Sequence, residues 1–392
     1  MAEPTELLAL ARTFGDAVLE RWERLVSLET PSADAGRAAV FGKELAAGLA
    51  ATADRIEHPS GPGGDHLVAY WNGRGTPSPS PSPEDGPGTG HTLLVAHSDT
   101  VFEAGTIARR PFTLDEDGDT VTGPGVFDMK GSLVAVELAM DLLSRTGAAP
   151  RRPVRLVVVN DEEIGSPDGA RLVARHAEGA HAVLGLEPPL PGGALKIGRR
   201  GVARIRLSVR GVSAHAGLDA ALGVSAIDEL VDQLASLRAT AASLPDAALN
   251  VGTITGGTRA NVVADHAEAE IGLRYATPET EQALLKAVLE PTPVRERAAL
   301  STRTLSHRPA WAMDPANPLA AELVALAGTL GLELPLGSSG GAGDTNLTGA
   351  LGIPTVDGLG PAGAGAHGED EHASLSSLLE RAALLAAFLE SH

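Results

Sequence analysis

The chain has 392 residues, of which 43% are hydrophobic, which is enough for two domains with apolar cores of their own. It contains no cysteine, which excludes a disulfide framework, a thiolate metal ligand and a thiol nucleophile. The formal net charge of −19 argues against nucleic acid or an anionic membrane as a partner.

The first residues, Met1-Ala-Glu-Pro-Thr-Glu, lack the basic and apolar regions of a signal peptide, and no apolar run approaches the length of a membrane span. We therefore expect a cytoplasmic protein. Apolar residues recur at helical spacing from Leu7 to Val26, and Pro31 ends the pattern, which predicts one surface helix. A helix over 37–53, a strand over 67–71 and an exposed Pro- and Ser-rich loop over 76–89 are predicted next.

Three apolar strands follow, and each leads directly into side chains that bind metals. Strand 92–97 ends in His97-Ser-Asp99, strand 154–159 precedes Glu162 and Glu163, and strand 182–186 precedes Glu187. Asp128 lies in a turn before a helix over 132–145. Alternating strands and helices predict an α/β domain with a doubly wound, mostly parallel sheet. Such sheets place their active sites at the carboxyl ends of the strands.

The pattern changes near Gly201, where apolar and charged residues alternate as in a half-exposed antiparallel strand. The order β-α-β-β-α-β that follows predicts an inserted α+β domain of the ferredoxin-like type. The α/β pattern resumes after Pro309 and returns His367 to the first domain. We therefore expect a catalytic domain in two parts, 1–199 and 310–392, around an inserted domain over 200–309.

The spacing of the polar residues predicts a division of roles. His97 and Asp99 are two residues apart on a strand, so both can face one site, and Asp99 is placed to orient the ring of His97. Glu162 and Glu163 are adjacent, so one is expected to bind metal and the other to move a proton. A pair of metal ions needs a bridging carboxylate and terminal ligands on each ion. Asp128 can serve as the bridge, and four residues can serve as terminal ligands: His97, Glu187, Glu163 and His367.

Alone, a His-x-Asp or a Glu-Glu pair is commoner as a surface turn than as a metal site, and the set of motifs is more specific than any member. From about residue 7 to 390 the motifs are His97-Ser-Asp99-Thr100-Val-Phe102, Gly123-Pro-Gly125 to Asp128-Met-Lys130-Gly131, Asn160-Asp-Glu162-Glu163-Ile-Gly165-Ser166, Leu186-Glu187-Pro188, Gly211-Val-Ser-Ala-His215-Ala-Gly217, Gly340-Gly341-Ala-Gly343-Asp344 and Gly363-Ala-Gly365-Ala-His367. In this order they resemble the M20 family of zinc peptidases and aminoacyl hydrolases, particularly its glutamate carboxypeptidase-like branch.

The resemblance implies two Zn²⁺ ions per chain, for which Co²⁺ can substitute. Asp128 would bridge them, with His97 and Glu187 on one ion and Glu163 and His367 on the other. It also implies that Glu162 is the general base and that Asp99 orients His97. Two departures, Ser132 after Gly131 and the run His367-Gly-Glu-Asp-Glu, remove no ligand.

The resemblance further implies residues that contact the substrate. The inserted domain over 200–309 would be a lid or dimerisation domain, and His215 would polarise the scissile carbonyl from the partner subunit of a homodimer paired through it. The free carboxylate of the substrate would be held by Arg308, Arg274, Asn261 and Gly341. Arginine suits such a carboxylate because it binds it through two parallel hydrogen bonds.

The expected activity is hydrolysis of an amide bond next to a free carboxylate, in a small peptide or an N-acyl amino acid. Release of a C-terminal acidic residue, N-acyl-amino-acid deacylation and dipeptide cleavage remain open at this point. A non-catalytic metal-binding scaffold is the alternative of a different class. It would be marked by the loss of Glu162 or of a ligand, and none is lost here.

Overall fold

A computed structural model describes residues 4–74 and 90–392 of the chain. They divide into two compact units. Unit 1 comprises Met1–Gly198, Met313–Ser339 and Gly343–His392, and unit 2 comprises Arg199–Ala312 and Gly340–Ala342. The loop predicted over 76–89 lies outside the described residues. Within the described ranges, no helix has the length and apolarity that crossing a bilayer requires.

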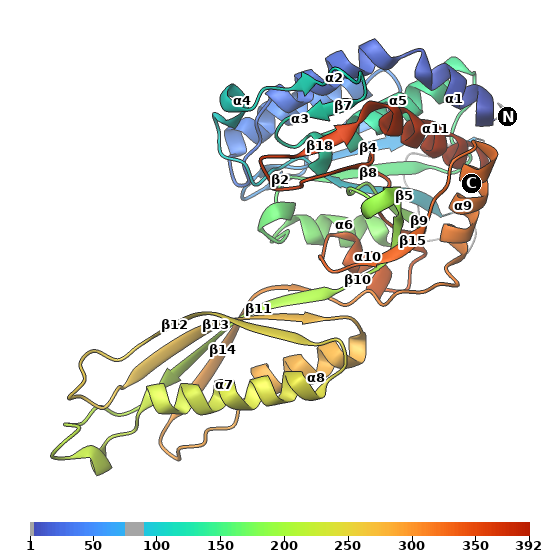
Figure 1. Cartoon of the computed structure of the whole chain (residues 1–392). Coiled ribbons are helices and arrows are strands. Elements are labelled where there is room, and N and C mark those ends of the chain that lie inside the picture. The colour runs from blue at the N-terminus through green and yellow to red at the C-terminus, as the bar shows by residue number, and fades with distance from the viewer. Residues whose placement is uncertain (1–3, 75–89) are drawn as a thin grey trace. The chain divides into compact units, whose positions relative to one another are not determined.

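A six-stranded sheet forms the centre of unit 1 (Figure 1). Its strands lie in the order β1 (Arg55–Glu57), β4 (Leu67–Trp71), β8 (Val154–Val159), β5 (His91–His97), β9 (Ala180–Gly185) and β16 (Thr355–Val356). Strands β8, β5, β9 and β16 pair in parallel, whereas β4 pairs antiparallel with both β1 and β8. The predicted mostly parallel α/β fold is therefore confirmed, with an antiparallel edge in addition.

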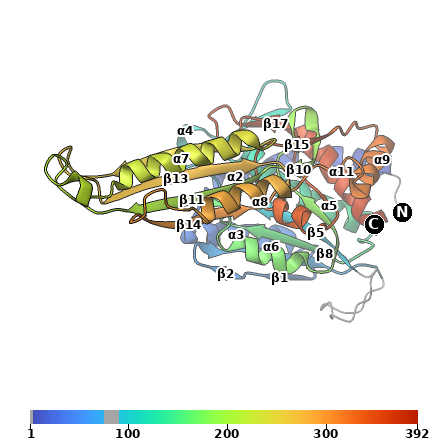
Figure 2. The same ribbon diagram turned by 90° about the horizontal axis from the view of Figure 1, so that it is seen from below.

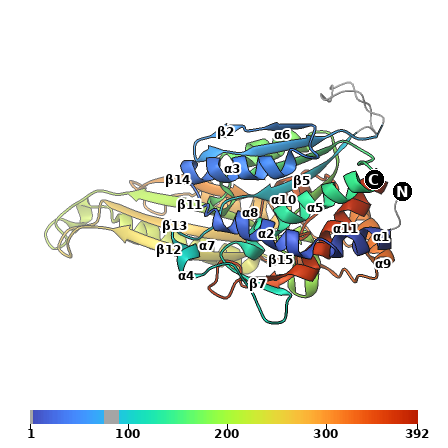
Figure 3. The same cartoon turned by 90° about the horizontal axis from the view of Figure 1, so that it is seen from above.

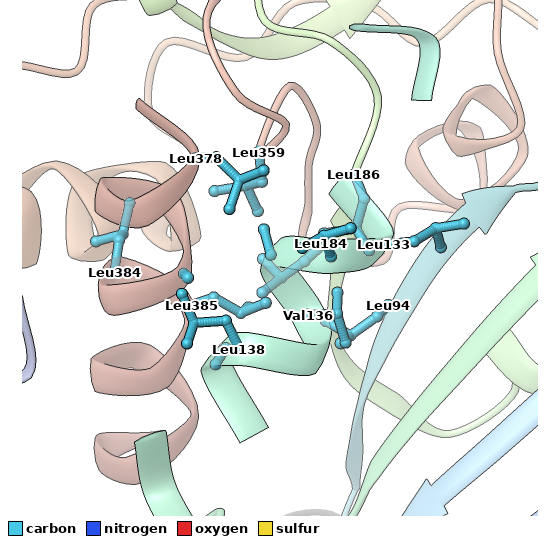
Figure 4. Packing of buried hydrophobic residues seen from close by; sticks show 14 of the residues in the cluster. Leu94, Leu133, Val136, Leu138, Leu184, Leu186, Leu359, Leu378, Leu384 and Leu385 are labelled. Carbon is cyan, nitrogen blue, oxygen red and sulfur yellow. The ribbon is translucent and has the colours of Figure 1, made fainter. Parts of the chain in front are cut away.

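Helices cover both faces of this sheet because its strands are apolar on both sides. One face carries Leu94 and Leu184 and packs against α1 (Pro4–Arg12), α2 (Gly15–Ser27), α3 (Ala35–Leu49), α5 (Gly131–Arg145), α9 (Pro318–Thr329) and α11 (Leu375–Ser391). Figure 3 looks onto α2, α3, α5 and α11, and Figure 4 shows the leucines of α5 and α11 meeting Leu94 and Leu184. The opposite face carries Leu93 and Val183 and packs against α6 (Gly169–Ala177).

The single helix predicted from Leu7 to Val26 is wrong, because the chain forms α1 and α2 with a turn between them. The N–H groups of Thr13 and Phe14 donate to carbonyls three residues back at 3.0 Å, which ends the first helix. Gly15 follows at the start of α2, and glycine inside a helix costs about 1 kcal/mol relative to alanine. Both helices bury apolar side chains in one core, so the hydrophobic spacing continues through the break.

Unit 2 is a four-stranded antiparallel sheet with two helices. The chain order is β11 (Gly201–Arg210), α7 (Ala226–Ser243), β12 (Ala248–Gly256), β13 (His266–Tyr275), α8 (Pro278–Leu289) and β14 (Ala299–Arg308), as predicted. In space the strands lie in the order β12-β13-β11-β14. Figure 2 shows α7 and α8 on one face of this sheet, where their apolar side chains join the buried residues of β11 and β13.

Short strands and turns complete unit 1, and most of them were not predicted. A second sheet has the order β17 (Gly363–Ala364), β18 (His372–Ser374), β7 (Thr120–Thr122) and β6 (Thr113–Leu114). The other strands are β2 (Ser60–Gly61), β3 (Gly64–Asp65), β10 (Leu195–Arg199) and β15 (Leu336–Ser339), and the other helices are α4 (Thr106–Arg109) and α10 (Thr345–Ala350). The β17–β18 hairpin is important for the site because its loop carries His367.

Removing apolar volume from the core of unit 1 should lower its stability. Leu384 on α11 is completely buried and belongs to the apolar core of unit 1, so Leu384→Ala should lower the free energy of unfolding by about 2–5 kcal/mol in a urea titration. Leu351→Ala is the matched control because its side chain is 61% exposed, and its change should stay within about 0.5 kcal/mol. Equal losses in the two variants would contradict this packing.

Candidate metal centre

The predicted metal ligands come together within unit 1, beyond the carboxyl ends of its parallel strands. His97 ends β5, Glu187 follows β9, and Glu162 and Glu163 lie in a 3₁₀ turn, η2 (Glu162–Ile164), that follows β8. Asp128 lies in the irregular helical turn η1 (Val126–Lys130), directly before α5. Parallel neighbours end at the same edge of a sheet. His97 therefore meets Glu162, Glu163 and Glu187, which lie 65 or more positions later in the sequence.

Asp128 lies between two histidines. Its Oδ1 is 3.0 Å from Nε2 of His97, and its Oδ2 is 3.4 Å from Nε2 of His367. His367 Nε2 also lies 3.1 Å from Oε2 of Glu163. One carboxylate therefore presents each of its oxygens to a different imidazole.

Two overlapping groups of potential ligand atoms meet at His97. The first is His97, Glu162 and Glu187, and the second is His97, Asp128 and Glu163, with the atoms of each group all within 4.8 Å of one another. His97 Nε2 lies 3.6 Å from Oε1 of Glu187. Both adjacent glutamates thus face the centre, each in a different group, which agrees with separate roles for them.

Asp99 holds this region together by a route that its spacing alone did not predict. Its buried carboxylate accepts the N–H groups of Glu162 at 3.1 Å and Glu163 at 3.2 Å, and the hydroxyl of Ser32 at 2.6 Å. Nδ1 of His97 lies 3.0 Å from the backbone carbonyl of Asp99 and 3.5 Å from its carboxylate. The residue contacts His97 mainly through its main chain, while its side chain fixes the turn that carries both glutamates.

The electrostatics of the centre favour positive charge. Burial opposes the charged form of Asp128, but its hydrogen bonds to His367 and His97 outweigh this and hold the pKa of Asp128 well below its usual range. Hydrogen bonds to Asp128 and Glu163 raise the pKa of His367 to about 10. Burial alone would lower the pKa of His97, yet its carboxylate neighbours raise it well above the ordinary value. A site that stabilises imidazolium in this way also attracts metal cations.

The donor set fits a divalent metal. Imidazole nitrogen and carboxylate oxygen are the ligands that zinc takes in the absence of cysteine. Among the described residues, Oε1 of Glu163 is a buried oxygen without a hydrogen-bond partner, although buried carboxylate oxygens are normally satisfied. A cation beside Glu163 and His367 would satisfy it.

Glu371 is a member of this region that the sequence did not reveal. It is completely buried, and its carboxylate accepts the N–H groups of Gly125, Phe127 and Asp128. Burial raises the pKa of Glu371 to about 7, although these three hydrogen bonds oppose the shift. The nearby Lys130 is also buried, and its Nζ donates to the carbonyl of Leu28 at 2.8 Å. In sequence, Glu371 ends the run Gly-Glu-Asp-Glu, which is typical of a solvated loop.

The residues predicted to contact substrate all lie in unit 2. His215 is exposed, and its Nδ1 accepts the N–H groups of Gly217 at 3.1 Å and Leu218 at 3.0 Å, so the proton of a neutral ring is on Nε2. The carbonyl of Asn261 accepts the N–H of Ala216 and so supports the same segment.

Arg274 and Arg308 belong to one row of the sheet of unit 2. Val202 on β11 pairs with Arg274 on one side and with Arg308 on the other, so both arginines point to the same face as Val202. Arg274 Nη1 lies 3.5 Å from the carbonyl of Gly340, and the exposed Gly341 follows. The structure therefore places both predicted arginines on one face.

Comparison with known proteins gives the family. The model of peptidase family M20/M25/M40 matches residues 93–391. Carboxypeptidase G2 of Pseudomonas sp. (strain RS-16) is 28% identical over 377 residues, covering 93% of this chain and 86% of the relative. A succinyl-diaminopimelate desuccinylase of Acidovorax ebreus (strain TPSY) is 31% identical over 282 residues, covering 68% of this chain and 70% of the relative.

Solved structures share the fold over nearly the whole chain. Aminopeptidase PepT from Bacillus cereus superposes with a TM-score of 0.74 at 20% identity, covering 96% of this chain and 98% of that one. An M20 family metallo-carboxypeptidase from Sulfolobus solfataricus superposes with a TM-score of 0.70 at 15% identity, covering 95% and 98%. With the family match over residues 93–391, the conclusion is that this chain belongs to peptidase family M20/M25/M40 and is a metal-dependent hydrolase.

Proposed function

We propose that the chain is a dinuclear zinc hydrolase that cleaves an amide bond next to a free carboxylate, in the manner of a glutamate carboxypeptidase. The observation that carries the proposal is Asp128, whose two oxygens lie 3.0 and 3.4 Å from two different imidazoles. Asp128 would bridge the ions, with His97 and Glu187 on one and Glu163 and His367 on the other.

Glu162 is the residue we assign to proton transfer. Its carboxylate lies within 4.8 Å of ligand atoms of His97 and Glu187, and the Asp99 carboxylate fixes its backbone. When bound, the metal ions supply a lowered pKa for the attacking water and polarise the scissile carbonyl. Glu162 takes the proton from the water and delivers it to the leaving amine nitrogen.

The substrate carboxylate is assigned to unit 2. Arg274 and Arg308 lie on one face in one cross-strand row, and the guanidinium group matches a carboxylate with two parallel hydrogen bonds. Asn261 and Gly341 are assigned to the same substrate carboxylate because of the residues beside them. Asn261 supports the His215 segment, and Gly341 follows the carbonyl that faces Arg274.

Three substrate classes remain within this proposal. The similarity to carboxypeptidase G2 covers 93% of this chain and favours carboxypeptidase action, the release of a C-terminal residue, over the other two classes. The succinyl-diaminopimelate desuccinylase relatives keep N-acyl deacylation as the second candidate, and dipeptide cleavage is the third. Turnover of a panel of C-terminal glutamyl peptides, N-acyl amino acids and dipeptides with added Zn²⁺ or Co²⁺ separates them. No turnover on any member of the panel would place the substrate of this hydrolase outside these three classes. A cytoplasmic location stays a prediction.

The dinuclear assignment predicts the amount of metal. Zinc-saturated protein should contain about two ions per chain by elemental analysis, because five ligands exceed what one catalytic zinc uses. His367→Ala should lower the content towards one ion, since it removes a ligand of the second ion only. Wild-type protein that stays near one ion after saturation would contradict the dinuclear centre.

The role of Glu162 predicts a loss of chemistry without a loss of metal. Glu162→Gln keeps the size of the side chain and removes the proton acceptor, so kcat should fall by about 10²–10⁴-fold. Zinc content and thermal unfolding should match the wild-type protein. Near-normal turnover, or lost turnover explained wholly by lost metal, would show that Glu162 is not the general base.

We also propose a homodimer paired through unit 2. Strand β12 lies at the edge of its sheet, Ile254 on it is 59% exposed, and α7 exposes Ile227 and Val231 at 39% and 56%. An exposed apolar edge strand is a template for pairing with another chain.

In this dimer, Nε2 of His215 would donate a hydrogen bond to the substrate oxygen in the partner subunit, so His215→Ala should lower kcat by about 10²–10³-fold.

Complementation tests the arrangement in trans. Equal amounts of inactive His215→Ala and inactive Glu162→Gln protein should recover about a quarter of the wild-type activity, because half of the dimers are mixed and each has one complete site. Replacing the second partner with the double variant is the control and should recover nothing. No recovery after verified subunit exchange, or full activity in a monomer, would rule the arrangement out.

A further inference from the structure

The loop between β17 and β18 carries two residues that contact the segments of the metal centre, one through the ligand side chains and the other through the backbone. His367 points its Nε2 at Asp128 and Glu163. Glu371, four residues later, is completely buried beneath the same region. Its Oε2 accepts the N–H of Gly125 at 2.8 Å, and its Oε1 accepts the N–H groups of Phe127 and Asp128, both at 3.0 Å.

These contacts join two segments that are about 240 residues apart in sequence. One segment carries Asp128, and the other carries His367. The His367 loop is closely folded, because His367 has φ +66° and Gly365 has φ +77°, where an added Cβ would lie 2.8 Å from the backbone of Asp370. The backbone of the proposed bridging ligand and the loop of a terminal ligand are thus fixed to one another through a single side chain.

The arrangement requires a carboxylate at this position. Three N–H donors converge on two oxygens, and a glutamine could offer only one oxygen while turning an NH₂ donor towards at least one of them. Hydrogen bonds from backbone N–H groups to a carboxylate are also shorter and stronger than those to a neutral amide oxygen. Replacing Glu371 therefore leaves buried donors of the Asp128 turn unpaired, and the turn must shift to satisfy them.

We propose that Glu371 is a positioning residue of the metal centre. It holds the Asp128 turn against the His367 loop and so sets the affinity for the ion between Asp128, Glu163 and His367. The proposal rests on the dinuclear function proposed above and assigns to Glu371 no contact with metal or substrate.

The test is a metal titration that needs no substrate. Apoprotein of the wild type and of Glu371→Gln is titrated with Zn²⁺ by calorimetry. Residues that support metal ligands typically contribute 10–100-fold to metal affinity, so the binding step that fills the site of Asp128, Glu163 and His367 should weaken by about that factor. Titration with Co²⁺ adds a second readout, because the visible absorption of the bound Co²⁺ should change when Asp128 and His367 are displaced.

Glu229→Gln is the matched control. Glu229 is also completely buried, and its carboxylate likewise accepts backbone N–H groups, those of Val294 and Arg295, together with the side chain of Gln233. It belongs to unit 2, whereas the ligand cluster belongs to unit 1. The control should therefore lose stability in thermal unfolding while keeping the zinc isotherm and the cobalt spectrum of the wild type.

Three results would decide against the proposal. They are wild-type zinc affinity in folded Glu371→Gln, an unchanged cobalt spectrum, or an equal loss of affinity in Glu229→Gln. If circular dichroism shows that Glu371→Gln does not fold, Glu371→Asp keeps the charge but shortens the reach, and wild-type affinity in that variant overturns the proposal. Wild-type protein that binds no zinc would instead overturn the proposed function, so the two failures are distinguishable.

Discussion

The parallel pairing of β8, β5 and β9 is the constraint on which the centre depends. In this register His97 lies opposite Val159, the last residue of β8, and Val95 lies opposite Gly185, the last residue of β9. The three strands end within two residues of one another, so the segments that follow them share one space. Apolar side chains on both faces secure the register, since a shift of one residue would turn each strand's buried side chains towards the wrong layer.

The main unfavourable energy within that space is the repulsion between like charges. Asp128, Glu162, Glu163 and Glu187 lie close together, and carboxylates at such separations repel one another and resist ionisation when buried. Backbone N–H donors and imidazoles offset this repulsion between the carboxylates. Asp99 ties the turn of Glu162 and Glu163 to the end of β5, and Glu371 ties the turn of Asp128 to the β17–β18 hairpin. The ligands themselves remain directed at each other, where a cation would neutralise them.

The sequence predicted the parts of this centre that depend on local pattern. An unbroken apolar run followed by His97, and another followed by Glu162, are visible without a structure because strand ends and polar side chains are local features. The four-strand insertion was equally visible from its alternation. The break between α1 and α2 was missed because the apolar spacing continues across it. Glu371 and the β6-β7-β18-β17 sheet were missed because they depend on contacts across more than 200 residues, and strands of two or three residues leave no periodic signal.

The insertion of unit 2 also governs the order in which the protein can form. Unit 2 is nearly continuous in sequence, whereas unit 1 needs β16, His367 and α11, which follow it. At a synthesis rate of about 5–20 residues per second, the hundred or so residues of unit 2 delay these elements by roughly 5–20 s. During that interval the leucines of α5 lack their partners on α11, and the Asp128 turn lacks Glu371. On the ribosome, the chain of unit 2 is therefore nearly complete before the last elements of unit 1 are made.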